Sequence, residues 1–365
     1  MNIQIITICD PVPNYGNKLQ NYAVQTYLER LTGANISTLE FEGNRCTWKS
    51  MFKYMLWRYL YIFKEQSQYW GIEFPKAVAF RKFDYKYLKM TKRFIPDKTD
   101  FFVVGSDQVW NPTWYHTNPK KKEMFLLAFA KPEQRVCFAP SFGLNELPEE
   151  WKGWFNEQLS MFPMLNVREK AGAEIIKKLT GRGTEVIIDP TLMLSKEDWQ
   201  LIESKPRGNV NLDEPYIFTY FLGNLPKKAV KDMERISKEK GLLIHQIMMK
   251  EDLDIYCSSP SEFVYLLEHA SLILTDSFHA CVFSFIFDKP FLVYAREGEE
   301  SNLLSRIETL LDAFSLKRKF VDQDEEKTFE EIFESNYTEG KKQLVLEQRK
   351  VRSCLIKAFN MKESV

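Results

Sequence analysis

The stretch LILTDSFHA, residues 272–280, indicates how the chain folds. Its apolar run is short and bounded by polar residues, which is typical of a buried strand. The run ends at Thr275-Asp276-Ser277, three residue types that favour the N-cap of a helix. Residues 280–287 are then apolar enough to form a buried helix. We therefore predict that His279 lies in the first turn of a helix, just beyond the carboxyl end of a strand.

That position favours a functional role for His279. In open α/β sheets, ligands bind in the crevice at the carboxyl ends of the strands. The free N–H groups and positive end of a helix N-terminus also favour an anion there. The alternative is that His279 only caps or packs, which is the commoner outcome for a lone histidine.

Length and composition describe a globular protein of two domains. The chain has 365 residues, more than one hydrophobic core usually organises. Its 44% hydrophobic and 27% charged residues are ordinary for a soluble protein. Lys+Arg and Asp+Glu are both 50, so the basic excess of a nucleic-acid binder is absent and we expect no nucleic-acid partner.

The six cysteines are scattered without CxxC or metal-ligand spacing. This favours a reducing cytoplasm, and we expect no metal. No basic stretch followed by a long apolar run marks a signal peptide, and no uncharged apolar run approaches the ~20 residues of a membrane span.

Strands and helices alternate along the chain, which predicts an α/β fold with mainly parallel sheets. We expect a Rossmann-like domain over 1–190, a linker rich in Lys, Pro, Gly and Asn over 191–215, and a second Rossmann-like domain over 216–326. The charged segment 327–365 is expected to be helical, with a return to the first domain as one arrangement. Two such domains around a cleft form a GT-B-like fold.

Residues 49–70 combine many aromatic residues with Lys and Arg. One interpretation is an interfacial segment that rests on a membrane surface. The other is a helical insertion packed on the sheet or at a subunit interface, which we favour.

Two further predicted strands end at polar side chains. Asp107 follows a buried strand and is either a general base or sugar ligand, or the cap of a following helix. Arg168 also follows a strand, and its planar guanidinium suits a carboxylate or phosphate. The alternative for Arg168 is a surface pair with Glu169 or Glu174. Near the N-terminus, Gly16 stands at a loop–helix junction where backbone can approach a ligand closely.

Six motifs in order resemble the polysaccharide pyruvyl transferase family: residues 14–23, 104–111, 139–143, 167–170, 189–192 and 275–280. The resemblance extends from 14 to about 311 and implies a GT-B-like fold. It also implies transfer of pyruvate from phosphoenolpyruvate to two hydroxyls of a sugar, as a cyclic ketal, in a bacterial surface polysaccharide precursor. Some members carry Arg-Leu-His where this chain has Ser277-Phe278-His279, and that arginine binds the donor. Arg296 or Arg306 are candidates to replace it.

The expected chemistry assigns roles to these residues. The candidates for donor binding are Arg168, Ser277, Arg296 and Arg306. His279 is the candidate acid or phosphate-side proton donor because imidazole titrates near neutral pH, and Asp107 is the candidate on the acceptor side. The candidates for acceptor binding are Asn17, Gln20 and Gln108. Phosphoenolpyruvate is a substrate, and no cofactor is expected.

The expected partners are phosphoenolpyruvate and a sugar acceptor. If the acceptor is lipid-linked, segment 49–70 is the place for membrane contact, at the inner face of the membrane. Two other functions remain open: a GT-B glycosyltransferase that uses a nucleotide-sugar, and a non-catalytic carbohydrate-binding protein of the same pathway. Binding of phosphoenolpyruvate, a nucleotide-sugar or neither distinguishes the three.

Overall fold

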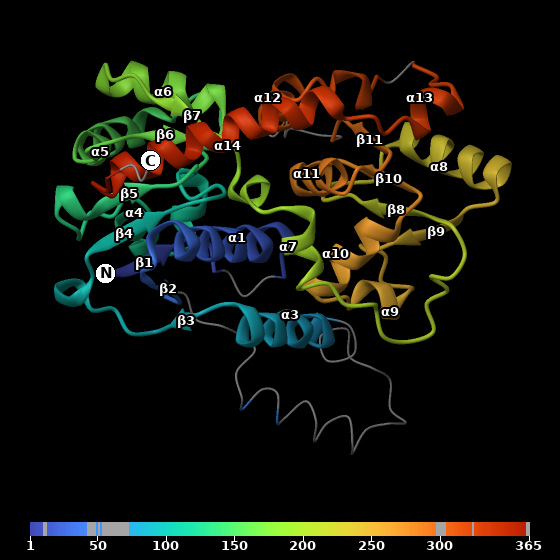
Figure 1. Cartoon of the computed structure of the whole chain (residues 1–365), viewed down its shortest axis with the longest axis horizontal. Coiled ribbons are helices and arrows are strands. Elements are labelled where there is room, and N and C mark those ends of the chain that lie inside the picture. Colours follow the sequence, from blue (N-terminus) through green and yellow to red (C-terminus); the bar gives the residue numbers. More distant parts are fainter. Residues whose placement is uncertain are drawn as a thin grey trace.

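Two parallel five-stranded sheets stand side by side in the computed structural model, which describes residues 1–9, 13–41, 73–296, 304–322 and 325–362, with Lys49 and Phe52 (Figure 1). The first sheet has the order β3-β2-β1-β4-β5, and the second has the order β12-β11-β10-β8-β9. The first contains β1 (Asn2–Ile6), β2 (Asn35–Leu39), β3 (Met90–Thr91), β4 (Phe101–Val104) and β5 (Arg135–Cys137). The second contains β8 (Tyr216–Tyr220), β9 (Leu243–Gln246), β10 (Leu272–Thr275), β11 (Phe291–Tyr294) and β12 (Phe320–Val321). All neighbouring strands are parallel, so the predicted α/β fold with two Rossmann-like units is confirmed.

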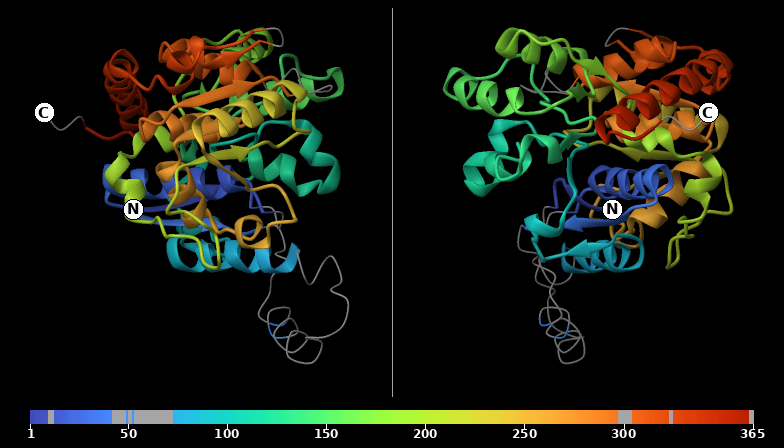
Figure 2. Two further views of the ribbon diagram at one scale, coloured as in Figure 1. Left: turned by 90° about the vertical axis from the view of Figure 1, so that its right-hand side faces the viewer. Right: turned by 60° about the vertical axis from the view of Figure 1, so that its left-hand side comes forward.

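Helices connect the strands and cover the sheets (Figures 1 and 2). The first half contains α1 (Tyr15–Thr32), α3 (Phe74–Tyr87), α4 (Lys120–Phe125), α5 (Glu149–Ser160) and α6 (Lys170–Thr180). A short strand pair, β6 (Asn166–Val167) and β7 (Glu185–Val186), flanks α6. The remaining helices are α7 (Lys196–Gln200), α8 (Lys227–Lys240), α9 (Leu253–Tyr256), α10 (Pro260–His269), α11 (Phe278–Ile286), α12 (Leu304–Ala313), α13 (Phe329–Phe333) and α14 (Thr338–Ala358). His279 therefore lies in the first turn of α11, beyond the end of β10, as predicted.

Each sheet has one point at which the strand order reverses. In the first sheet, later strands are added on one side of β1 up to β3 and then on its other side from β4, so the reversal lies between β1 and β4. In the second sheet, the reversal lies between β8 and β10. A loop that leaves one strand there passes to one face of the sheet, and the loop from its neighbour passes to the other. The space between such loops is the usual ligand crevice of an open α/β sheet.

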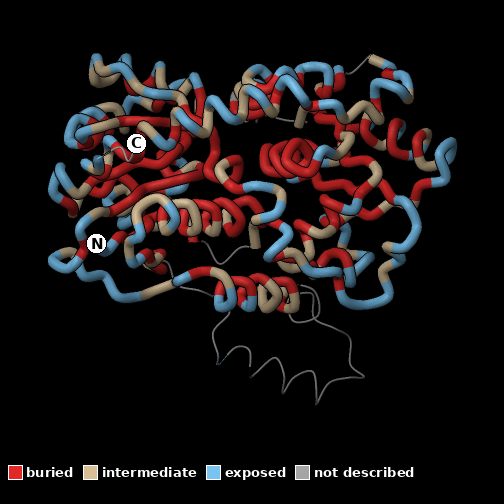
Figure 3. Tube along the Cα trace, in the orientation of Figure 1, coloured by how far each residue is buried: buried red, intermediate tan, exposed pale blue. Residues whose placement is uncertain are grey.

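One hydrophobic core extends through both halves, and buried backbone fills the centre of the molecule (Figure 3). All residues of β8 and β10 are buried, because helices cover both faces of the sheet. Tyr15 of α1 stacks on Phe263 of α10 with ring centroids 4.4 Å apart. The Tyr15 hydroxyl also donates to the Ser258 carbonyl oxygen at 2.9 Å. The first turn of α1 is thus fixed to the second half of the chain.

The 191–215 span is packed structure over part of its length. It carries most of the 3₁₀ helix η5 (Pro190–Met193) and all of α7. Trp199 in α7 is fully buried, and its ring lies 4.7 Å from that of Phe283 in α11. The sequence predicted a linker here and missed α7, because the capping box from Ser195 to Asp198 stands among residues that are typical of loops.

Helix α14 runs from the second half back along the first (Figure 1). The Lys350 ammonium donates to the Val186 carbonyl oxygen at 2.8 Å, and the ring of Phe359 packs on Phe101 at 5.1 Å. The domain boundaries that we expect at 190, 215 and 326 stay predictions.

Among the described helices, none combines the length and hydrophobicity that crossing a bilayer requires. Apart from Lys49 and Phe52, segment 49–70, with its membrane or packing interpretation, lies outside the described residues.

Candidate active site

A cleft of about 410 Å³ lies where the reversal points of the two sheets face each other. The first sheet contributes the β1–α1 junction and the loop after β4. The second contributes the loops after β8 and β10. The lining residues that matter for chemistry are Asn14, Gly16, Asn17, Asp107, Gln108, Trp114, Tyr220, Asp276, Ser277, His279, Arg296 and Arg306.

The N-termini of α1 and α11 meet at this cleft. A Cβ atom on Gly16 would lie 2.2 Å from Nδ1 of His279, so the absence of a side chain makes room for the imidazole. Asn14 caps α1 by accepting from the backbone N of Asn17 at 3.1 Å. Ser277 occupies the N-cap of α11, but its side chain makes no capping bond. Ser277 therefore faces the cleft without the capping contact that its residue type favours.

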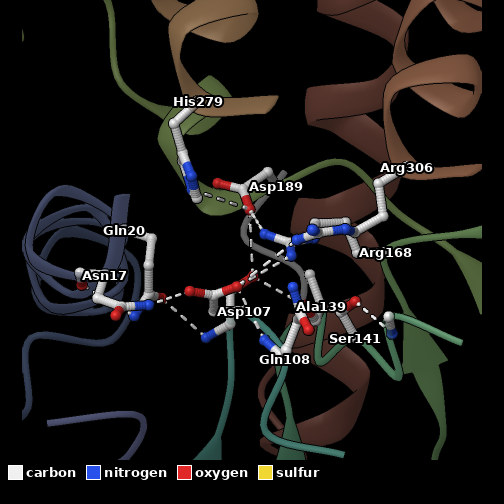
Figure 4. A network of polar contacts seen from close by, with 12 residues as sticks. Asn17, Gln20, Asp107, Gln108, Ala139, Ser141, Arg168, Asp189, His279 and Arg306 are labelled. Carbon is white, nitrogen blue, oxygen red and sulfur yellow. Dashed lines mark hydrogen bonds and ion pairs between the residues drawn. The ribbon is translucent and has the colours of Figure 1, made fainter. Parts of the chain in front are cut away.

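Asp107 connects both halves at the floor of the cleft (Figure 4). Its Oδ1 lies 3.3 Å from Nη2 of Arg168 and 3.7 Å from Nη1 of Arg306, and its Oδ2 accepts from the Asn17 amide. Its φ of 67° turns the chain sharply after β4, and no helix begins there. The helix that follows, η3 (Pro112–Thr117), is capped by Asn111. The capping alternative for Asp107 is therefore wrong.

Arg168 lies behind Asp107, where it bridges two carboxylates. It donates to Asp189 as well as contacting Asp107, and its guanidinium carbon lies 4.8 Å from the Phe278 ring centroid. Burial raises the pKa of Asp189, but the Arg168 guanidinium, His279 and the hydrogen bonds from Thr191 together outweigh burial and hold that pKa at about 2. Arg168 is 3% exposed, so the surface-pair alternative is wrong. It lines an adjacent hollow of about 290 Å³ instead of the cleft itself.

His279 is buried beside this ion pair, 7% exposed, with Nε2 lying 4.0 Å from Oδ2 of Asp189. Burial lowers its pKa, although Asp189 and Asp107 oppose that change. The imidazole is therefore neutral at pH 7 in this state. Its buried Nε2 has no hydrogen-bond partner. A neutral ring with an unsatisfied nitrogen is well suited to gain a proton when negative charge arrives.

Arg306 brings a guanidinium to the cleft from α12. Burial and the nearby Arg168 lower its pKa to about 10, so it remains a cation at neutral pH. The Gln108 amide oxygen faces it, at 2.8 Å from Nη2 and 3.2 Å from Nη1. That orientation follows because a guanidinium carries only donors.

Arg296 reaches the cleft from the end of β11 and is held by Asp276. Its Nε donates to Oδ2 of Asp276 at 2.8 Å. The same carboxylate accepts from the backbone N of Leu222 at 2.7 Å and of Gly223 at 3.0 Å. Asp276 thus organises both the cation and the loop after β8.

Gln20 does not line the cleft, although the sequence placed it among the acceptor contacts. It is fully buried, and its amide donates to Oγ1 of Thr7 at 2.9 Å and accepts from the backbone N of Ser106 at 3.0 Å. These bonds fix the loop that carries Asp107, so Gln20 supports the site from behind.

The structure therefore gathers His279, Asp107, Asn17, Gln108, Ser277, Arg296 and Arg306 at one cleft, with Arg168 next to it. Sequence reasoning gave no role to Asp189 or to Asp276. Asp276 directly follows β10, and Asp189 stands three residues after β7. The position after a strand, which identified Asp107 and Arg168, therefore applied to them as well.

Comparison with known proteins identifies a family and a set of remote structural neighbours. A family model described as polysaccharide pyruvyl transferase matches residues 14–298. No curated protein sequence matches the chain. A structure of UDP-GlcNAc 2-epimerase from Neisseria meningitidis bound to UDP-GlcNAc has a TM-score of 0.43 and 10% identity, covering 98% of this chain and 100% of that one. The UDP-GlcNAc 2-epimerase of Methanocaldococcus jannaschii, in complex with UDP-GlcNAc and UDP, has a TM-score of 0.42 and 13% identity, covering 95% and 99%.

Proposed function

Because this chain belongs to the polysaccharide pyruvyl transferase family, we propose that it transfers pyruvate from phosphoenolpyruvate to two hydroxyls of one sugar, forming a cyclic ketal. The acceptor in this proposal is a precursor of a bacterial surface polysaccharide. The reaction takes place in the cytoplasm, which is consistent with the free thiols of Cys137, Cys281 and Cys354.

One observation carries the proposal: cations from the second half and the imidazole of His279 converge at a cleft formed by facing helix N-termini. Phosphoenolpyruvate carries a phosphate and a carboxylate, so its site needs fixed cations and N–H donors. Arg296 and Arg306 line the cleft, and Ser277 stands at the positive end of α11. In this proposal the two arginines take the two anionic groups of the donor.

Arg168 has a different role in the proposed site. Its guanidinium is committed to Asp107 and Asp189 and lies outside the cleft. We assign it to positioning these two carboxylates, with its positive charge adding to the field that attracts the donor. It takes no direct bond to the donor.

The reaction must move two protons, saturate the C=C bond of phosphoenolpyruvate and break its C–O bond to phosphate. The first sugar hydroxyl adds to the central carbon of phosphoenolpyruvate, and a proton goes to the methylene carbon, which becomes a methyl group. The C–O bond to phosphate then breaks, and the second hydroxyl adds to the same carbon. Its proton leaves with inorganic phosphate, so that atoms and charge balance.

His279 and Asp107 are the proposed proton carriers. The imidazole is neutral in the free enzyme, and the negative charge of a bound donor raises its pKa, because an adjacent anion favours the charged form. A protonated His279 then supplies the proton that the methylene carbon or the departing phosphate needs. Asp107 receives the hydroxyl proton when the donor anions draw Arg306 away from it.

The acceptor occupies the side of the cleft formed by the first half. Asn17 and Gln108 line that side and offer amide groups to sugar hydroxyls, and the exposed ring of Trp114 offers a surface for stacking. A lipid-linked acceptor would extend from this side.

The test is a thermal-shift titration with phosphoenolpyruvate, run beside UDP-sugars and GDP-sugars. A ligand at a hundred times its Kd stabilises the folded state by about 2.7 kcal/mol, which raises Tm by about 3 °C for a chain of this length. We expect that shift with phosphoenolpyruvate, and its loss in Arg306→Gln and His279→Gln.

The matched control is Arg30→Gln, which removes an exposed arginine in the last turn of α1 that pairs with Asp198 of α7. This variant should keep the full shift. A shift with nucleotide-sugars alone would contradict pyruvyl transfer and favour a glycosyltransferase. No shift with any ligand would favour a carbohydrate-binding protein without this activity.

A further inference from the structure

A second cluster of chemically capable side chains lies away from the cleft, between the 191–215 span and the end of α10. Glu203, Glu268 and His269 each bring one oxygen or nitrogen to within 4.8 Å of the others. His269 ends α10, and β10 begins at Leu272, so the cluster lies near the amino end of β10. The cleft is at the carboxyl end of the same strand. The two sites therefore occupy opposite edges of the second sheet.

Glu268 carries one buried oxygen that accepts no hydrogen bond. The residue is 7% exposed, and its Oε1 accepts from Nε2 of Gln200 at 2.6 Å and lies 3.4 Å from the Lys196 ammonium. Its Oε2 is buried with no partner, and the same is true of Oε2 of Glu203. Two buried carboxylate oxygens without donors repel each other and call for a positive charge or a proton between them.

His269 is oriented to donate a lone pair. Its Nδ1 lies 3.0 Å from the Tyr265 carbonyl oxygen, which can only accept, so Nδ1 carries the hydrogen. The lone pair of the neutral ring is then on Nε2. The ring also stacks on Tyr265 at 3.9 Å, which fixes its plane. A hydrogen bond from one ring nitrogen to a carbonyl is the usual support of an imidazole that binds a metal through the other nitrogen.

We propose that Glu203, Glu268 and His269 bind a divalent first-row transition ion, for which Zn²⁺ is the probe. Two carboxylates and one imidazole are a ligand set that Zn²⁺ accepts, with water at the fourth position. Ligand atoms around a tetrahedral ion lie about 3.4 Å apart. The present separations, up to 4.8 Å, close by rotation of the half-buried Glu203 side chain.

A shared proton is the competing occupant. Burial and the neighbouring Glu268 raise the pKa of Glu203 to about 7, so the pair can hold a proton near neutral pH. Lys196 lies beside the pair and Lys289 is also close, and both reduce the negative charge available to an ion. Only the ion would use the lone pair on Nε2 of His269, so the two occupants predict different effects of changing that residue.

The ion would act on structure, because the cluster joins Glu203, just beyond α7, to the end of α10. It would fix the 191–215 span to the second half, and it would take no part in the chemistry of the cleft.

The experiment is equilibrium dialysis of the chelator-treated, full-length chain against Zn²⁺. We expect about one Zn²⁺ per chain, and binding at least about tenfold weaker in His269→Ala and Glu268→Gln. His269 is exposed, so its variant should fold even if Glu268→Gln does not. His116→Ala, which removes another exposed histidine outside the cluster, is the matched control and should bind as the parent does.

Co²⁺ in place of Zn²⁺ reports the ligands, since a nitrogen–oxygen site lacks the intense thiolate charge-transfer bands of a cysteine site. Binding that is unchanged in both cluster variants would overturn the proposal. So would an absence of Zn²⁺ binding, and a carboxyl group that titrates near pH 7 in the same protein would then identify the proton as the occupant.

Discussion

Replacing Asp189 with asparagine tests the ion-pair network most directly. The carboxylate is completely enclosed, and it faces the Arg168 guanidinium, His279 and the Ser106 hydroxyl through the same oxygen. The Asp189→Asn variant keeps the shape of the side chain and one acceptor oxygen, but it removes the charge that balances Arg168. The ion-paired carboxylate that then remains to the guanidinium is Asp107, at 3.3 Å.

The size of the effect follows from burial. Breaking a buried ion pair by removing one charge costs about 3–5 kcal/mol, because the remaining charge stays in a medium of low polarity. For a chain of 365 residues this loss lowers Tm by about 4–6 °C. The control is Asp198→Asn, which breaks the pair with Arg30, where the side chains are 51% and 19% exposed. Exposed pairs contribute at most about 1 kcal/mol, so this Tm should fall by less than about 2 °C.

Acidification probes the same carboxylate without a mutation. Its pKa in the folded chain is about 2, below the ordinary value of 3.8, so the unfolded chain binds the proton more readily. The stabilisation is complete above pH 4 and amounts to about 2 kcal/mol, and it is lost as the pH falls from 4 towards 2. Calorimetry of both variants and the parent across this range measures it. Equal Tm losses in Asp189→Asn and Asp198→Asn would refute the buried-pair reasoning. So would a loss of stability between pH 4 and pH 2 that is the same in Asp189→Asn as in the parent.

Three other predictions concern the cleft. Gly16→Ala places a methyl group 2.2 Å from Nδ1 of His279, so the rate of phosphate release from phosphoenolpyruvate in the presence of acceptor should fall about 100-fold. The control Gly153→Ala, with open space around its Cβ position, should keep full activity. Equal activities of the two variants would contradict the contact. The His279 ring should titrate below pH 6.5 by NMR in the free chain, because burial lowers its pKa, and phosphoenolpyruvate should raise that value; an unchanged value would separate the imidazole from the donor. Asp276→Asn weakens the acceptor of two backbone N–H groups and Arg296, so the amides of Leu222 and Gly223 should exchange hydrogen faster, and exchange at the parent rate would show that the carboxylate does not hold this loop.

Local signals explain which elements the sequence revealed. The start of α10 is marked in the sequence, because Ser259 and Glu262 form a capping box and Pro260 stands at the first helical position. The strand and helix around His279 were also predicted from local sequence, since an apolar run, a polar break and a second apolar run leave few other interpretations. Strand ends then led to Asp107, Arg168 and His279.

Partners that are distant in sequence were hidden. Periodicity places Gln20 on α1 but cannot show that its amide bonds Thr7 and Ser106 instead of facing the cleft. Likewise, Glu169 is the carboxylate next to Arg168 in sequence, yet Arg168 pairs with Asp189, 21 positions away. The fold, and not the distance along the chain, decides which acceptor is nearest to the guanidinium. The network joins six separate segments, which contribute Asn17, Asp107, Arg168, Asp189, His279 and Arg306, and no single segment predicts it.

The stacking of Tyr15 on Phe263 has a consequence for exchanging halves between relatives. A protein engineer who joined the first half of this chain to the second half of another member would cut within the 191–215 span, where the chain passes from the first sheet to the second. The crossover would still separate Tyr15 from the ring and the Ser258 carbonyl that hold it. Since the next residue is Gly16, which faces His279, a mismatched ring there would displace the side of the cleft that Gly16 and His279 form. Functional chimeras should therefore be those that inherit the residues at 15, 258 and 263 from one parent, wherever the backbone is joined.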